Sequence, residues 1–192
     1  FKGFFRTMIF LPCTTSLVAY AIIFRSLFAN DGLVNYVLVN LGILDKPYNF
    51  LTQPFAAKMV IILALLWRWT GYNMVFFLSG LQNIEYSVYE AAKIDGASAI
   101  QTFFKITVPL LKPTILLTAI MSTNGTLQLF DESINLTDGG PANASISMSH
   151  YRYNLCFKYV PNFGYAAAMS FFILLLVAVL AFIQMRVGDK RD

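Results

Sequence analysis

Four long runs of apolar residues dominate the chain. They cover residues 8–28, 59–81, 114–130 and 164–185, and the last run is the most uniformly apolar. A membrane-spanning helix needs about 20 consecutive, mainly apolar residues, whereas a helix on the surface of a soluble protein has a polar face. The pattern therefore predicts an all-α fold, a polytopic transmembrane helical bundle in which these runs are four spans.

Shorter amphipathic segments lie between the spans. After the first span, helical spacing of five apolar residues predicts a helix at the membrane interface: Leu33, Val34, Val37, Leu38 and Leu41. Between the third and fourth spans, residues 131–163 are expected to contain a turn at residues 139–141. A helix through Ile146, Tyr153 and Phe157 is expected to follow that turn.

Composition supports a membrane protein, because 57% of the residues are hydrophobic and only 12% are charged. Soluble domains have about 25% charged residues, and disordered chains need low hydrophobicity and high charge. Four spans place both termini on one side, together with most basic residues: Lys2, Arg6, Lys93, Lys105, Lys112, Arg186, Lys190 and Arg191. Since cytoplasmic segments carry the excess of Lys and Arg, both termini and residues 82–112 are predicted to be cytoplasmic.

Few basic residues fall on the opposite side. They are Lys46, Arg152 and Lys158, with Lys58 at the border of a span. This asymmetry accounts for the net charge of +4, so no nucleic-acid partner is needed to explain it.

The predicted cytoplasmic loop, residues 82–112, contains two helix-start signals. Ser87 with Glu90, and Ser98 with Gln101, both fit the S-x-x-E/Q capping box. Gly96, between them, suits the left-handed residue that follows a helix. The loop is therefore expected to contain a short helix, a tight turn and a second helix.

The second helix is expected to be amphipathic and to end at Pro109, before Pro113 starts the third span. Its apolar face contains Ile100, Phe103, Phe104 and Val108. In the first helix, Ala91 and Ala92 offer a small surface that another backbone can approach. From these residues alone, docking of a partner and packing against the chain's own bundle are equally open.

Two polar faces are expected at membrane depth. The second span contains one with helical spacing, Trp69, Tyr72, Asn73 and Phe76, and the third span continues into another, Asn124, Gln128 and Asp131. Polar groups at this depth line water-filled paths or join helices by hydrogen bonds, and both interpretations stay open for any single residue. Arg68 costs about 2.5–3.5 kcal/mol at mid-span, so a carboxylate or backbone carbonyls are expected beside it.

Enzymatic chemistry is not indicated by the sequence. An intramembrane enzyme needs paired acid–base groups or clustered metal ligands at membrane depth, whereas His150 is the single histidine and stands in an outer loop. The sequence lacks the G-x-x-x-x-G-K-[ST] loop that binds ATP phosphates. We therefore expect no catalytic residue, metal site or cofactor in this chain.

One pattern in the loop consists of Glu90, Ala91, Ala92, Asp95 and Gly96, followed by Ile106 and Pro109. It resembles the EAA motif of ABC importer permeases. The segments at residues 137–141 (TDGGP) and 162–168 (NFGYAAA) resemble the sugar branch of that family, of the maltose, lactose and multiple-sugar type.

Permeases of this family usually have six spans, with the EAA loop between the fourth and fifth. Here the EAA loop follows the second span and the chain starts at Phe1, so residues 1–192 are expected to be part of one transmembrane domain that lacks two upstream helices.

The resemblance implies ATP-driven import of a carbohydrate across the bacterial cytoplasmic membrane. The seven EAA residues named above would then contact a cytoplasmic ATPase, and the two polar faces would belong to the sugar path. The expected partners are a second homologous permease, two ATPase subunits that bind ATP and Mg²⁺, an extracytoplasmic solute-binding protein and membrane lipid. The alternatives are an importer of another solute, such as glycerol phosphate or polyamine, and a membrane receptor or scaffold without transport.

Overall fold

The computed structural model describes residues 1–188, and this range is helical without a β-strand. The predicted positions of Lys190 and Arg191 lie outside the described residues. In chain order, the helices are α1 (Lys2–Thr14), α2 (Leu17–Leu27), α3 (Leu33–Asn40), α4 (Pro54–Gln82), α5 (Tyr86–Ile94), α6 (Ala99–Thr102), the π turn η1 (Phe103–Thr107), α7 (Val108–Leu110), α8 (Lys112–Leu127), α9 (Asp131–Thr137), α10 (Met148–Tyr153), the π turn η2 (Asn154–Lys158) and α11 (Phe163–Gly188).

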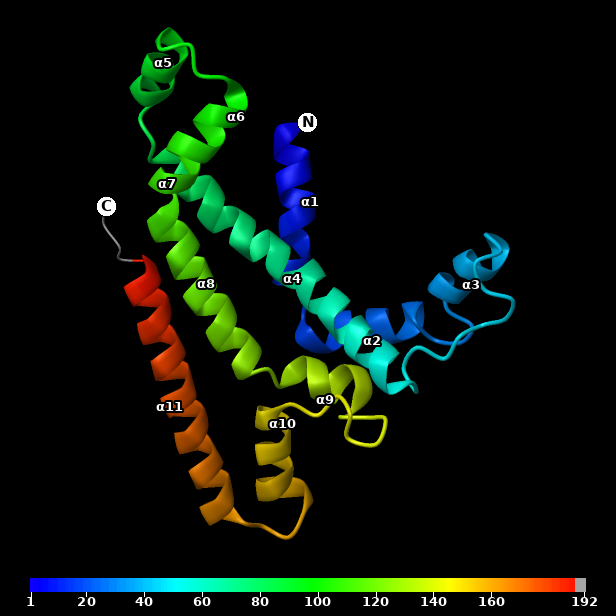
Figure 1. Cartoon of the computed structure of the whole chain (residues 1–192). Coiled ribbons are helices and arrows are strands. Elements are labelled where there is room, and N and C mark those ends of the chain that lie inside the picture. The colour runs from blue at the N-terminus through cyan, green and yellow to red at the C-terminus, as the bar shows by residue number, and fades with distance from the viewer. Residues whose placement is uncertain (189–192) are drawn as a thin grey trace.

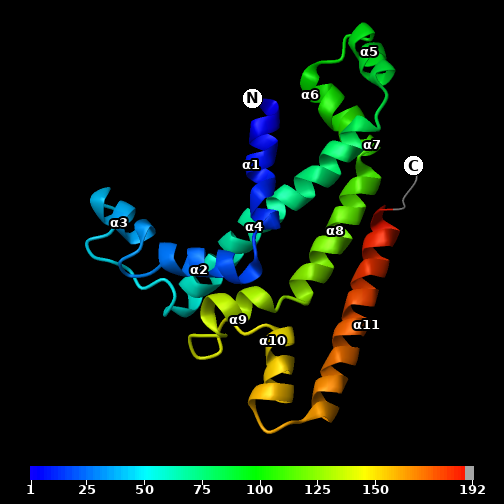
Figure 2. The same ribbon diagram turned by 180° about the vertical axis from the view of Figure 1, so that it is seen from behind.

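The long helices run between two opposite ends of the molecule. The N-terminus, α5 and the C-terminal end of α11 lie toward the same end of the molecule, at the top of Figure 1. Helices α2, α9 and α10 lie toward the opposite end, and α3 projects sideways from the bundle in both views (Figures 1 and 2). This arrangement agrees with a bundle whose helices cross a membrane in alternating directions.

Two of the predicted spans are single helices that are long and apolar enough to cross a membrane. They are α4, which extends the predicted 59–81, and α11, which extends the predicted 164–185. The other two are helix pairs with a bend, Gly3–Thr14 with Leu17–Leu27 and Ala99–Leu110 with Lys112–Leu127. The described residues therefore contain two spans, or up to four if each bent pair is one span.

The prediction of one continuous helix over residues 8–28 is wrong, because α1 and α2 meet at 102°. Pro12 lies in the last turn of α1, and Thr15 has extended backbone angles. The hydroxyls of Thr14 and Thr15 both donate to the Leu11 carbonyl, at 2.8 and 3.3 Å. Short polar side chains thus satisfy a carbonyl at the helix end, and the chain turns there without leaving it unpaired.

The third predicted span, residues 114–130, also ends earlier than expected. Helix α8 stops at Leu127, and Asp131 is the first residue of α9 rather than the last position of a face on the third span. Asp131 and Glu132 form the first turn of α9, where negative charge is favourable to the helix dipole. Asn124, Gln128 and Asp131 therefore do not share one helix.

The loop at residues 82–112 folds into two helices with a left-handed turn at Gly96, whose φ is +73°. The capping box at Ser98 and Gln101 is confirmed, with both reciprocal hydrogen bonds present. The box at Ser87 and Glu90 is wrong, because α5 starts after Glu85 and Ser87 is already helical. The hydroxyl of Ser87 instead donates to the Glu85 carboxylate at 3.2 Å.

The helix that follows Ser98 contains the π turn η1 and bends by 64° into α8. The π turn lies just before Pro109, which lacks the N–H that would donate to the carbonyl at position 105. Pro113, at the start of α8, fits the prediction that the third span begins at that proline.

The core lies where α2, α4 and α9 meet. Its buried residues are Tyr20, Ala21, Phe24, Val60, Ile61, Ala64 and Leu136. Helix α1 crosses α4 so closely that a Cβ on Gly71 would lie 2.2 Å from the Ile9 carbonyl oxygen. Helices α4 and α8 also approach closely at Gly80, where a Cβ would lie 2.7 Å from the Thr114 hydroxyl.

The outer segments partly follow the predictions. The expected interfacial helix is α3, and buried Asn35 anchors it, because its amide donates to the Ala29 and Tyr48 carbonyls, both at 2.9 Å. The turn at residues 139–141 and a helix through Tyr153 are present, and Phe157 lies in η2. Ile146 precedes α10, and helix α9 was not predicted.

Candidate functional site

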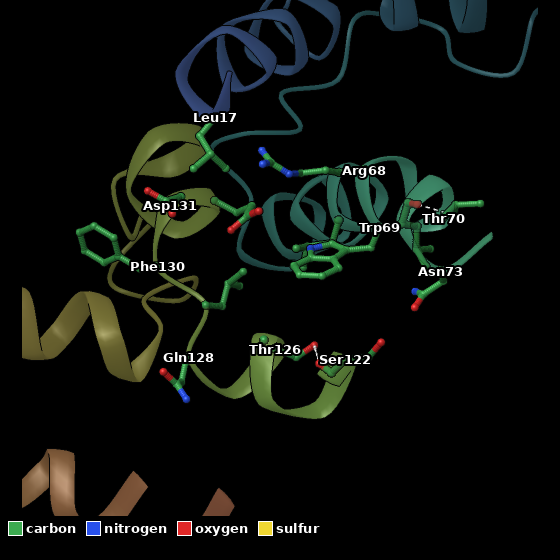
Figure 3. Close-up of a pocket in the computed structure, with 15 residues that line it drawn as sticks. Leu17, Arg68, Trp69, Thr70, Asn73, Ser122, Thr126, Gln128, Phe130 and Asp131 are labelled. Carbon is green, nitrogen blue, oxygen red and sulfur yellow. Dashed lines mark hydrogen bonds between the residues drawn. The ribbon is translucent and has the colours of Figure 1, made fainter. Parts of the chain in front are cut away.

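A cavity of about 430 Å³ lies between α4 and the joint of α8 and α9 (Figure 3). Helix α4 contributes Arg68, Trp69 and Asn73, and the opposite wall contains Gln128, Asp131 and Glu132. Leu17, Leu65, Leu66 and Leu129 add apolar surface. The volume lies within the range of about 300–1,000 Å³ that is typical of small-molecule sites, and such sites combine apolar walls with a few polar groups.

The first predicted polar face lies only partly on this cavity. Trp69 and Asn73 line it, whereas Tyr72 and Phe76 do not. The three aromatic rings form an edge-to-face series along α4, with centroid distances of 5.4 Å from Trp69 to Tyr72 and 5.0 Å from Tyr72 to Phe76. Tyr72 and Phe76 therefore support the orientation of Trp69, whose indole reaches Gly125 on α8.

The second predicted face is divided by the break between α8 and α9. Gln128 and Asp131 line the cavity, whereas Asn124 does not. The Gln128 amide donates to the Asn124 side chain, so Asn124 orients a residue of the wall. The structure thus brings together Trp69, Asn73, Gln128 and Asp131.

Sequence reasoning missed two residues next to the cavity. Glu132 lines it and is only 6% exposed, and Tyr20, from α2, is fully buried behind the wall. Glu132 could have been recognised from the sequence, because it is a second carboxylate next to Asp131 and Arg68 was expected to have an acidic neighbour. Tyr20 gave no such signal, since nothing local to α2 indicates that its ring meets α4.

Arg68 lies over the ring of Tyr20, with its guanidinium carbon 5.3 Å from the ring centroid. A guanidinium at this distance from an aromatic face makes a favourable cation–π contact. Figure 3 shows the side chain extending toward Leu17. Within residues 1–188 no ion pair shorter than 4 Å joins Arg68 to a carboxylate, although Glu132 shares the cavity with it.

A second cavity of about 440 Å³ adjoins the first, because Gln128 and Phe130 line both. It lies between α10 with η2 and the start of α11. In its wall, Arg152 donates to the Ser170 hydroxyl at 3.2 Å. The two cavities place Gln128 between the α4 side and the α11 side of the bundle.

Five of the seven residues predicted to contact an ATPase lie on α5 or within two residues of its end, at the end of the molecule that α5 forms in Figure 1. The other two, Ile106 and Pro109, lie in η1 and α7. Glu90, Ala91, Asp95 and Gly96 are exposed, whereas Ala92 is buried. Among the described residues, neither carboxylate has a hydrogen bond or ion pair. These side chains are therefore accessible to another molecule, and Ala92 holds α5 to its own loop.

A hydrogen bond connects α5 to the helix that leads into α8. The hydroxyls of Tyr89 and Thr107 lie 3.4 Å apart. Ile106 is half-buried beside Thr107, and Pro109 is exposed. The hydrogen bond therefore joins α5 to the helical segment that precedes the bend into α8.

His150, in the outer segment, is completely buried. Its Nδ1 lies 2.9 Å from the Ser133 hydroxyl, which donates to the Ser145 carbonyl. Burial lowers the pKa of His150 below 6.5, and Lys158 adds to this effect, whereas Asp138 opposes it. In the part of the chain that the structure describes, no group of three His, Cys, Asp or Glu side chains is placed to hold a metal ion.

Comparison with known proteins gives relatives over nearly the whole chain. The lactose transport system permease protein LacF of Rhizobium radiobacter is 55% identical over 193 aligned residues, which cover 100% of this chain and 65% of that protein. The crystal structure of a bacterial ABC transporter involved in the import of the acidic polysaccharide alginate matches with a TM-score of 0.87 and 25% identity, over 97% of this chain and 65% of its own. A bacterial alginate ABC transporter in complex with an alginate pentasaccharide-bound periplasmic protein matches with a TM-score of 0.78 and 26% identity, over 98% of this chain and 65% of its own.

The chain thus spans about two thirds of the length of these relatives. The family model described as the binding-protein-dependent transport system inner membrane component matches residues 1–191. The helical fold of this chain matches that of the solved ABC transporter. The chain belongs to the family of binding-protein-dependent transport system inner membrane components.

Proposed function

We propose that this chain is the permease portion of an ABC importer that carries a carbohydrate across the bacterial cytoplasmic membrane. The observation that supports this most is the cavity between α4 and the α8–α9 joint, with Trp69 beside Asn73 on one wall and Gln128 on the other. The face of an aromatic ring covers the C–H surface of a sugar, and amides bind its hydroxyls. The named substrates of the relatives, lactose and alginate, are both carbohydrates.

The position of the cavity suits a transport path. It is bordered by the joint between α8 and α9, and Leu17, at the start of α2, lies in its wall. Secondary transporters place solute sites where helices are interrupted near the middle of the membrane, because freed backbone groups and helix ends can face a solute. Because the chain is already interrupted between α8 and α9, this wall can rearrange without breaking a continuous helix.

The exposed residues of α5 are the proposed contact with an ATPase subunit. Glu90, Ala91 and Asp95 would enter a groove of that subunit, and Gly96 would set the turn behind them. ATP binding would bring two ATPase subunits together and move α5, and the link from Tyr89 to Thr107 would pass the movement to α8. ATP and Mg²⁺ would be bound by the ATPase subunits, and this chain would supply no cofactor.

The remaining partners follow from the same proposal. A second, similar permease would complete the path, and a solute-binding protein would deliver the sugar from outside, as the periplasmic protein accompanies the solved alginate transporter. The side that holds the N-terminus, α5 and the end of α11 would be cytoplasmic, in agreement with the excess of basic residues there.

The coupling role is tested by Glu90→Lys and Gly96→Pro in the full-length protein, assembled with its partners in membrane vesicles. Both variants should abolish sugar uptake while membrane insertion stays normal, because the first reverses an exposed charge and the second cannot adopt a φ of +73°. Asp45→Lys, an equal charge reversal on the opposite side, is the control and should transport normally. Unchanged uptake in both α5 variants would exclude the coupling role.

The path is tested by Trp69→Ala and Asn124→Ala. Each should change the KM or the maximal rate of uptake without loss of assembly, since one removes a ring from the cavity wall and the other frees Gln128. Phe55→Ala, at an exposed position of α4 outside the cavity, is the matched control. Wild-type kinetics in both cavity variants would mean that these faces only join helices.

A further inference from the structure

Three polar side chains from three helices meet at the wall of the cavity. Arg68 from α4 and Glu132 from α9 line it, and Tyr20 from α2 lies behind them. Tyr20 is 0% exposed and Glu132 is 6% exposed, so both side chains are largely shielded from solvent within this chain. Arg68, Glu132 and Asp131 are the charged groups that face the Tyr20 side chain.

The hydrogen-bonding capacity of this cluster is only partly used within the described chain. One guanidinium nitrogen of Arg68, Nη1, is buried without a hydrogen-bond partner. Among residues 1–188, Glu132 forms no ion pair within 4 Å, and the Tyr20 hydroxyl is its hydrogen-bonding neighbour. Buried polar groups in native proteins nearly always have partners, and a buried charge without one is costly. Arg68 therefore needs a further hydrogen-bond partner, which the cavity beside it can hold.

We propose that Arg68 and Glu132 form a binding subsite of this cavity for the hydroxyl groups of an uncharged saccharide. A sugar hydroxyl can accept a hydrogen bond from the guanidinium and donate one to the carboxylate, so neighbouring hydroxyls satisfy both groups at once. Trp69, the next residue after Arg68, offers a ring face to the same molecule. Tyr20 is a positioning residue, since its ring holds the guanidinium by the cation–π contact.

The charge balance of the wall selects between classes of saccharide. Asp131 and Glu132 carry two negative charges against the one positive charge of Arg68. At the short distances within this cavity the excess repels a uronate, whereas it leaves an uncharged sugar unaffected. This chain is therefore expected to differ from the solved transporter, which imports an acidic polysaccharide. The inference rests on the proposed function of the cavity as a saccharide path.

The test uses the full-length permease in its complete transporter, in nanodiscs, and measures equilibrium binding of lactose, digalacturonate and spermidine. Arg68→Met and Glu132→Gln should each weaken lactose binding by about tenfold or more, because each removes hydrogen bonds to a charged group. Lys58→Met, which removes an exposed charge of α4 outside the cavity, should leave lactose binding unchanged within about twofold. Glu132→Gln should also improve binding of digalacturonate relative to lactose by about fivefold or more, a change that a merely structural residue would not produce.

The outcomes separate the subsite from the function. Wild-type lactose affinity and an unchanged ratio of digalacturonate to lactose in Glu132→Gln would overturn the subsite, while lactose uptake by the wild type would still support the proposed function. If wild-type transporter binds spermidine and no saccharide, both proposals fail. If Arg68→Met does not assemble, the two Glu132→Gln measurements decide, because that variant keeps the size and shape of the side chain.

Discussion

Replacing Gly71 with alanine should force α1 away from α4. The new Cβ would lie 2.2 Å from the Ile9 carbonyl oxygen and 2.8 Å from the Phe10 Cα. Both neighbours are backbone atoms, so no change of side-chain rotamer can relieve the clash. Restoring van der Waals distances requires the two helices to separate by about 1 Å at their crossing.

The cost can be estimated from two opposing effects. Overpacking of a well-packed interior costs about 1–3 kcal/mol, and a contact between backbones belongs near the upper value. Alanine gains about 1 kcal/mol over glycine inside a helix. The net destabilisation is therefore about 2 kcal/mol, which corresponds to a decrease in Tm of about 4–8 °C for a chain of this size.

A thermal unfolding assay on the purified full-length protein in detergent can measure this change. A thiol-reactive fluorophore reports unfolding, because Cys13 in α1 and Cys156 are both free and half-buried. Gly3→Ala is the matched control on α1, since a Cβ there meets nothing within 4 Å. That control should unfold at the wild-type temperature or slightly above. If Gly71→Ala also unfolds at or above the wild-type temperature, the close crossing of α1 and α4 is refuted.

Three further outcomes are expected. Because burial lowers the pKa of His150 below 6.5, the folded state binds fewer protons than the unfolded state just below that pH, and Tm should fall as the pH decreases from 6.5. His150→Gln should reduce this slope in a Tm series from about pH 8 to 5, and an identical slope would contradict the assignment. Ser98→Ala should cost about 1 kcal/mol locally and speed hydrogen exchange at residues 99–102, whereas an unchanged exchange rate would show that the cap with Gln101 contributes nothing. The Gln184 amide donates to the Thr123 hydroxyl at 2.8 Å, so a double-mutant cycle with Gln184→Leu and Thr123→Val should give a coupling of about 0.6 kcal/mol, and additivity would refute the bond between α8 and α11.

The apolar runs were sufficient to predict α4 and α11, because a membrane helix satisfies its backbone hydrogen bonds within its own segment. Local signals also worked where the interaction is local. The cap at Ser98 and the left-handed turn at Gly96 each depend on residues within one turn of the chain. The S-x-x-E pattern wrongly placed a helix cap at Ser87, because α5 starts directly after Glu85, two residues earlier.

The bends were beyond the reach of hydropathy. A window over residues 8–28 is apolar whether the helix is straight or turns by 102°, and the turn depends on how α2 packs against α4 and α9. The hydroxyls of Thr14 and Thr15 permit the turn, but they are common in straight membrane helices as well.

The candidate site shows the same division. The sequence by itself determined a membrane-embedded helical chain, the left-handed turn at Gly96 after α5, and the aromatic and amide side chains at helical spacing on α4, because these follow from composition and from contacts within one helix. Only the tertiary structure decided that Tyr20, Arg68 and Glu132 meet at one wall, and that Trp69 shares a cavity with Asp131 but not with Phe76. The physical reason is that these side chains come from helices far apart in the chain, and their meeting depends on the bend before α2 and the break before α9.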